Sequence, residues 1–191
     1  MIIWPAMWFG MRVRIVAIVV LFAALCAAEE WSRFRGPNGS GISADTGLPV
    51  EFGKEEHLVW PTPVRPGKSS PVLTDRHVLL TGAEAGKLYT QCFDRSTGKL
   101  LWERAIDQPR EEQVNALNHP AALSPVTAGG RVFSFFKDFG LAAYDLKGKQ
   151  LWTAPLGPYT VSMGLGASPV VAEGSVVVLA DQLEGSFIAG F

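Results

Sequence analysis

The side chains most able to do chemistry in this sequence are its few histidines and one loop of charged and amide groups. His119 lies in the segment NALNHPAALSP, close to Asn115 and Asn118, and the segment REEQ spans residues 110–113. A single imidazole with no identifiable acid or nucleophile is weak evidence for acid–base catalysis. We therefore interpret His119 as a structural or surface residue, and REEQ as a solvated loop rather than a metal site.

No other pattern in the sequence predicts a reaction centre. His57 and His77 lie beside expected strand and turn positions, and Cys92 occupies an apolar position that predicts a buried, inert thiol. The segment GPNGSGIS, residues 36–43, is rich in glycine but lacks a P-loop lysine, so we interpret it as a surface loop. The sequence also has no Cys/His metal spacing and no nucleophile elbow. We expect no catalytic, cofactor-binding or metal-ligating residues.

Composition limits the class of partner. The chain has 191 residues and a formal net charge of −1. This balance gives no electrostatic reason to expect binding of nucleic acid. The chain contains 20 glycines and 13 prolines, which suits many short strands joined by turns.

The first 28 residues are typical of a secretory signal peptide. They contain a basic start, an apolar run too short for a comfortable transmembrane helix, and small residues up to Ala28. We expect cleavage after Ala28 and a periplasmic or secreted location. An uncleaved anchor is the alternative, and contact with a membrane is expected only through this segment.

A tripeptide and a tryptophan recur along the rest of the chain. Ser-Pro-Val occurs three times, with Pro71, Pro125 and Pro169 spaced by 54 and 44 residues, and Trp102 and Trp152 are 50 residues apart. A repeat of this length, with short apolar runs, frequent turn signals and no helical period, is typical of a four-stranded propeller blade. Two hairpins of a β-sandwich, the alternative, would not need a shared period. The sequence predicts an all-β fold, a partial β-propeller of four-stranded antiparallel blades.

The repeated phrase, CFDRSTGKLLW and then AYDLKGKQLW, is expected to be the turn between the third and fourth strands of a blade. Its aspartate can accept hydrogen bonds from backbone N–H groups two or three residues on. Its glycine can supply the positive φ of a hairpin with a bulge, and its tryptophan can lie flat between neighbouring blades. The residues of this structural motif are Asp94, Thr97, Gly98 and Trp102 in the first copy, and Asp145, Gly148 and Trp152 in the second.

On these residues the chain resembles the PQQ-like (quinoprotein-type) β-propeller repeat proteins. Their blades carry the tryptophan-docking motif Ala-x-Asp-x-x-Thr-Gly-x-x-x-Trp, which matches residues 92–102 with Cys92 in place of alanine. The second copy is one residue shorter between Asp and Gly. The opening WSRFRGPNGSGIS, residues 31–43, resembles the start of exported bacterial members. These motifs are specific for the fold and weak for function.

The resemblance implies a ring of seven or eight blades, of which this chain would supply about three as an N-terminal fragment. The expected blades span about 69–106, 123–156 and 167–191, and the last is incomplete. Residues 29–56 would form an N-terminal extension. Residues 57–64 would form a lone closing strand whose partner strands lie in later sequence.

The resemblance leaves two classes of function open. We favour a non-catalytic binding or scaffold module of the cell envelope, whose ligand is a protein or a polysaccharide; scaffolds that assist outer-membrane protein assembly carry the same repeat. The alternative is the N-terminal piece of a PQQ-dependent quinoprotein oxidoreductase, with PQQ and calcium as cofactors. No residue here matches a calcium or quinone ligand of those enzymes, and their adjacent cysteine pair is missing from this sequence.

Overall fold

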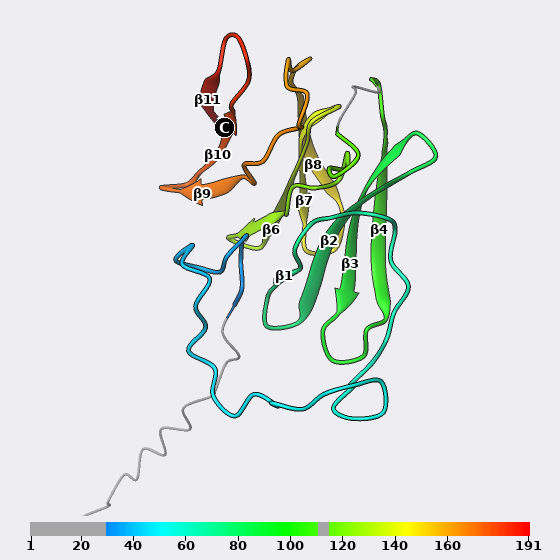
Figure 1. Ribbon diagram of the computed structural model, residues 1–191. Helices are drawn as coiled ribbons and strands as arrows, with labels where there is room; N and C mark the ends of the chain where they lie inside the picture. The colour runs from blue at the N-terminus through cyan, green and yellow to red at the C-terminus, as the bar shows by residue number, and fades with distance from the viewer. Residues whose placement is uncertain (1–29, 111–114) are drawn as a thin grey trace, which may run out of the picture.

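The computed structural model describes residues 30–110 and 115–191, and the regular structure in these residues is entirely β (Figure 1). The predicted signal peptide and residues 111–114 lie outside the described residues. Three antiparallel sheets follow one another along the chain. The strands of the first are β1 (Val72–Leu73), β2 (His77–Glu84), β3 (Lys87–Asp94) and β4 (Leu100–Asp107); of the second, β5 (Val126–Ala128), β6 (Arg131–Phe136), β7 (Gly140–Asp145) and β8 (Gln150–Pro155); of the third, β9 (Val170–Ala172), β10 (Ser175–Ala180) and β11 (Phe187–Gly190). A helix long and apolar enough to cross a membrane is not found in the described part of the chain.

Each sheet is a meander, because short turns join strands that are neighbours in sequence. The β2–β3 hairpin is the longest, pairing from His77 with Asp94 to Glu84 with Lys87. Its tip, Ala85 and Gly86, has positive φ at both residues, which matches the right-handed twist of the paired strands. The first two sheets have four strands each and the third has three.

The hydrophobic core lies between the sheets. Between the first and second sheets the buried cluster consists of Val72, Leu79, Cys92, Trp102, Val132, Ala142 and Tyr144. Between the second and third sheets the cluster includes Phe133, Phe135, Leu141, Val176, Val178 and Ala180. Each large apolar side chain buried in this way contributes about 1.5–3 kcal/mol. Neighbouring sheets therefore hold one another in the arc that Figure 1 shows.

The serines of Ser-Pro-Val link the sheets through hydrogen bonds. The backbone N–H of Ser70 donates to Oγ of Ser124 at 2.9 Å, and the N–H of Ser124 donates to Oγ of Ser168 at 3.0 Å. Ser124 and Ser168 thus each accept a hydrogen bond from the equivalent serine of the preceding sheet. In the sequence the tripeptide marks the period but does not indicate this role; its threefold occurrence was the available signal.

The closing strand expected at residues 57–64 stays a prediction, because the segment pairs with no strand among the described residues. Its prolines, Pro61 and Pro63, have no N–H to give to a ladder. The segment is held by side chains instead: Trp60 Nε1 donates to the carbonyl of Arg95 at 3.1 Å, and Thr62 Oγ1 donates to the carbonyl of Gly98 at 2.7 Å.

The N-terminal extension crosses the inner strands of two sheets. Trp31 forms an isolated antiparallel bridge with Leu73 of β1, and the carbonyl of Ser32 accepts a hydrogen bond from the N–H of Thr127 in β5 at 2.8 Å. The first residues of the extension therefore add a backbone link between the first and second sheets.

Candidate functional site

Asp94 shapes the turn between β3 and β4. Its Oδ1 accepts hydrogen bonds from the backbone N–H groups of Ser96 and Thr97, at 3.0 and 2.8 Å, and from their hydroxyls, at 2.6 and 2.8 Å. These donors, the Ser96 hydroxyl first, favour the ionised carboxylate and lower the pKa of Asp94 to about 2. Gly98 completes the turn at a φ of +69°, and its N–H donates to the carbonyl of Asp94 at 2.8 Å.

We expect this turn to make stability depend on pH in acid. The pKa of Asp94 is lower in the folded chain, at about 2, than in the unfolded chain, at about 3.9. Its stabilising contribution is therefore fully present above the unfolded value and is lost as the pH falls through the folded value. Thermal unfolding measured from about pH 5 to pH 2 should show this loss, and Asp94→Asn should reduce it. The exposed Asp75 gives the control Asp75→Asn, and equal acid dependence in both variants would contradict the prediction.

The turn between β7 and β8 is one residue shorter and is also shaped by an aspartate side chain. Asp145 Oδ1 accepts hydrogen bonds from the N–H groups of Lys147 and Lys149, at 2.9 and 2.8 Å. Gly148 has a φ of +80°. No residue takes the place of Thr97, but the strand pairing shifts at a β-bulge at equivalent positions of the first two sheets. The turn between β7 and β8 is thus one residue shorter, but Trp152 keeps the position in its strand that Trp102 has in β4.

Trp102 docks on the turn of the next sheet. Its side chain is 7% exposed, and a Cβ added to Gly148 would lie 2.7 Å from two of its ring atoms. Its Nε1 donates to the carbonyl of Leu146 at 2.9 Å, and Arg104 Nε donates to the carbonyl of Gly148 at 2.6 Å. Only a glycine leaves room for the indole at this distance.

Trp60 makes the equivalent contact on the first sheet. A Cβ on Gly98 would overlap the six-membered ring of Trp60. Trp60 and Thr62 donate hydrogen bonds to carbonyls of the β3–β4 turn. Trp102 and Arg104 donate to the equivalent carbonyls of the β7–β8 turn. The docking role of Trp60 was not predicted from the sequence. The signal was the sequence Leu-Val-Trp at 58–60, which parallels Leu-Leu-Trp at 100–102.

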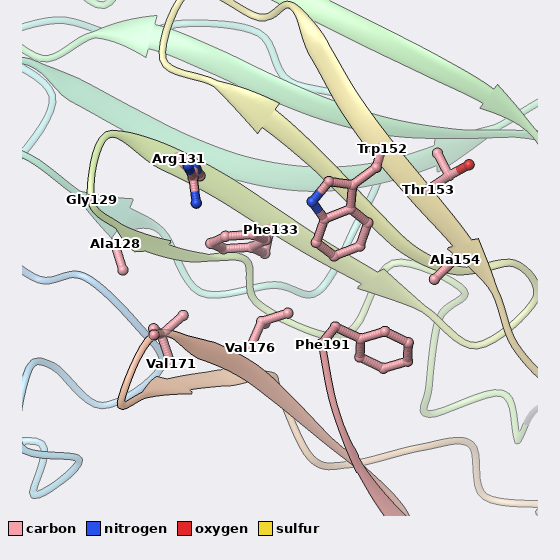
Figure 2. A pocket seen from close by; sticks show the side chains of 11 residues that line it. Ala128, Gly129, Arg131, Phe133, Trp152, Thr153, Ala154, Val171, Val176 and Phe191 are labelled. Carbon is pink, nitrogen blue, oxygen red and sulfur yellow. The ribbon is translucent and has the colours of Figure 1, made fainter.

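Trp152, the third tryptophan of the series, borders an open hollow. The hollow, of about 730 Å³, lies between the second and third sheets (Figure 2). The Trp152 ring lies 5.9 Å from that of Phe133 and is stacked on Phe191 at 6.3 Å, measured between ring centroids. In the described part of the chain, no turn glycine covers Trp152 in the way that Gly98 and Gly148 cover the other two.

The turns after β1, β3, β5 and β7 lie at one end of the first two sheets and carry an excess of positive charge (Figure 1). We call this surface the basic face; its cations are Arg76, Arg95, Lys99, Arg131, Lys147 and Lys149, and its acids are Glu30, Asp75, Asp94 and Asp145. All its cations are exposed except Arg95, which is half-buried. None of them forms an ion pair with a described residue.

Two features keep the turns of the basic face well ordered. The carboxylates of Asp94 and Asp145 are already engaged by the turns that they shape. The turns of the two sheets also meet: Arg131 and Leu146 line one small hollow together with Asp75. The surface thus presents cations on turns whose backbone is fixed by hydrogen bonds.

The other residues considered from the sequence lie apart from the basic face or are buried. His119 lies in the loop before β5, where its Nδ1 accepts a hydrogen bond from the N–H of Ala121 at 3.2 Å. Partial burial, and then the charge of Lys68, lower the pKa of His119. Asn118 Nδ2 donates to the carbonyl of Met163, and Asn115 Oδ1 accepts from the N–H of Leu117, so both amides bind loop backbone.

Cys92 lies in the core between the first and second sheets. It is fully buried, and this burial raises the pKa of its thiol to about 12. Residues 30–110 and 115–191 contain no group of three or more His, Cys, Asp or Glu side chains able to hold a metal ion. The expectation of a chain without calcium or quinone ligands stays a prediction.

Comparisons with known proteins give two findings. The family model described as outer membrane protein assembly factor BamB matches residues 52–189. A crystal structure of BamB from Moraxella catarrhalis is similar at 18% sequence identity and a TM-score of 0.42; the match covers 64% of this chain and 36% of that chain. This chain therefore spans about a third of the length of that protein. The search of curated proteins found no match.

Proposed function

The chain belongs to the family described as outer membrane protein assembly factor BamB, whose members are PQQ-like β-propeller repeat proteins, and from this premise we propose that it is a non-catalytic scaffold of the cell envelope. We propose further that its basic face binds an acidic segment of a partner protein. The observation that carries this proposal is the group of six cations on or directly beside four turns, none paired with an acid among the described residues.

The arrangement suits recognition of an acidic polypeptide. Positive side chains held on one surface raise the local potential and speed the approach of an anionic partner. The sheets below the turns are interlocked by Trp102 and by the serine hydrogen bonds, so a partner does not have to order the surface when it binds. An exposed charged surface of this kind acts mainly on association rate and specificity, and its effect falls with added salt.

Charge reversal on the basic face tests the proposal. A fluorescent oligoglutamate peptide should bind the chain with an affinity that falls as salt is added. The double variant Lys147→Glu/Lys149→Glu should weaken binding roughly tenfold, a change of about 1.4 kcal/mol. Lys87→Glu is the control, because Lys87 lies at the β2–β3 turn away from this face and pairs with Asp107 at 2.6 Å. Fluorescence anisotropy gives the affinities.

Two outcomes would contradict this function. Equal affinity of the Lys147→Glu/Lys149→Glu and Lys87→Glu variants would mean that the basic face is not the binding surface. Tighter binding of polygalacturonate than of the peptide, lost in the same double variant, would assign the surface to an acidic polysaccharide instead of a protein.

A further inference from the structure

Another hollow, of about 730 Å³, lies within the basic face, between the β1–β2 and β3–β4 turns at one end of the first sheet (Figure 1). His77 and Asp94 border it, and they pair directly across β2 and β3. Each lies two residues along its strand from a side chain that is buried between the first and second sheets, Leu79 or Cys92. Because side chains two residues apart point to the same face of a strand, the hollow lies on the side of the first sheet that faces the second.

The charge of this hollow depends on His77. Its other ionisable lining residues are two aspartates and two arginines, Asp75, Asp94, Arg76 and Arg95, whose charges cancel. Histidine side chains change their charge between about pH 5 and 8, whereas arginine stays charged and aspartate ordinarily ionises near about pH 3.9. The turn also keeps the carboxylate of Asp94 ionised, at a pKa of about 2. The hollow is therefore neutral when the imidazole is neutral, and cationic when it is protonated.

The charged groups around His77 come from both turns and from the second sheet. Asp94, directly opposite in the strand register, favours a proton on the ring, while Arg76 and Arg95 disfavour it. On the side of the second sheet, the charged residues of the adjoining hollow are Glu30, Asp75 and Arg131. An anionic group that entered the hollow would offset the arginines and favour the protonated ring. Binding of an anion and protonation of His77 are therefore linked.

The imidazole and one guanidinium are held in place by Thr74, which is buried. Its Oγ1 lies 3.0 Å from Nδ1 of His77 and accepts hydrogen bonds from the N–H groups of Arg76 and His77, at 3.3 and 3.0 Å. Its carbonyl accepts a hydrogen bond from Nη1 of Arg95 at 2.8 Å. The second ring nitrogen of His77, Nε2, binds no described residue, so it is the nitrogen left for a ligand.

The second sheet has a permanent cation at the position of His77. Leu79 of β2 and Phe133 of β6 are equivalent, since each pairs with the valine of Ser-Pro-Val in its own sheet. His77 and Arg131 each lie two residues before these positions. The basic face thus carries an arginine at this position of one sheet, and a side chain whose charge can change at the same position of the other.

We propose that the hollow beside His77 receives a carboxylate of the acidic partner, and that this carboxylate binds more tightly when His77 is protonated. The affinity of the basic face then rises as the pH falls through the range in which histidine gains its proton. The cations of the second sheet keep their charge across this range, so they supply the part of the affinity that persists at higher pH. This inference rests on the proposed function, to which it adds a point of contact and a response to pH.

A fluorescent oligoaspartate peptide tests the proposal, because its side chains stay ionised well above their usual pKa of about 3.9. At constant ionic strength, the parent chain should bind it about threefold more tightly at about pH 6 than at about pH 8, the effect of one exposed ion pair. His77→Gln should bind at both pH values as the parent does at the higher one. His77→Arg, which copies the second sheet, should bind at both as the parent does at the lower one. His119→Gln is the matched control: it makes the same substitution in the loop before β5, apart from the basic face, and should keep the threefold response.

NMR titration of the imidazole gives a second readout, which a purely structural role of His77 would not change. By linkage, bound peptide must favour the proton as much as the proton favours the peptide, so His77 should titrate about half a pH unit higher when the peptide is bound. Equal affinity of the parent at both pH values, or a threefold response that persists in His77→Gln, would overturn this inference and leave the proposed function in place. Absence of peptide binding at both pH values would contradict the proposed function, and this inference with it.

Discussion

Replacing Trp102 with alanine is expected to lower the free energy of unfolding by about 3–5 kcal/mol, as for other buried aromatic side chains. The ring fills the space between the first and second sheets, against Gly148 and at 5.9 Å from the ring of Tyr144. Its removal leaves a cavity and takes away the Nε1 donor from the carbonyl of Leu146. Both the cavity and the lost hydrogen bond weaken the contact between the first and second sheets.

Urea unfolding followed by circular dichroism measures this effect. Leu101→Ala is the matched control, because Leu101 precedes Trp102 on β4 and is 47% exposed. Its loss should change the free energy of unfolding by about 0.5 kcal/mol or less. A Trp102→Ala variant as stable as this control would mean that the docked ring does not hold the sheets together.

Much of the fold could be predicted because its turn chemistry is local in sequence. Asp94, Gly98 and Trp102 fall within nine residues, and their order alone indicates a hairpin turn that ends on a docking side chain. The repetition of this phrase and of Ser-Pro-Val indicated successive antiparallel sheets. The all-β class, the propeller blades and the resemblance to PQQ-like repeat proteins are confirmed by the sheet topology and the family model.

What the sequence could not predict depends on contacts between distant residues. Arg65 donates to the carboxylates of Glu103 and Glu84 and lies 4.6 Å from the centre of the Tyr89 ring, which fastens the segment before β1 to the first sheet. Nothing in the local pattern around Arg65 indicates these partners. The basic face was missed for the same reason: its cations lie on or directly beside four separate turns that only the sheets bring to one end.

The second large effect is expected from Gly148→Ala, which should cost about 2–5 kcal/mol through two separate terms. The left-handed backbone at φ +80° disfavours any side chain by about 1–2 kcal/mol. The new methyl group would also lie 2.7 Å from the Trp102 ring and force it out of place. Gly130→Ala isolates the first term, because Gly130 has a φ of +72° but no atom within 4 Å of the added Cβ. Chemical denaturation of both variants should show Gly148→Ala as clearly the more destabilising.

The double variant Trp102→Ala/Gly148→Ala decides whether the glycine is required by the tryptophan or by the turn. If the indole sets the requirement, the cost of Gly148→Ala should fall in the Trp102→Ala background to about 1–2 kcal/mol, the backbone term alone. The two substitutions would then be non-additive by about 1–3 kcal/mol, the size of the overpacking that the first removes. Additive effects would show that Gly148 serves only the turn, and that its contact with the Trp102 ring does not require a glycine.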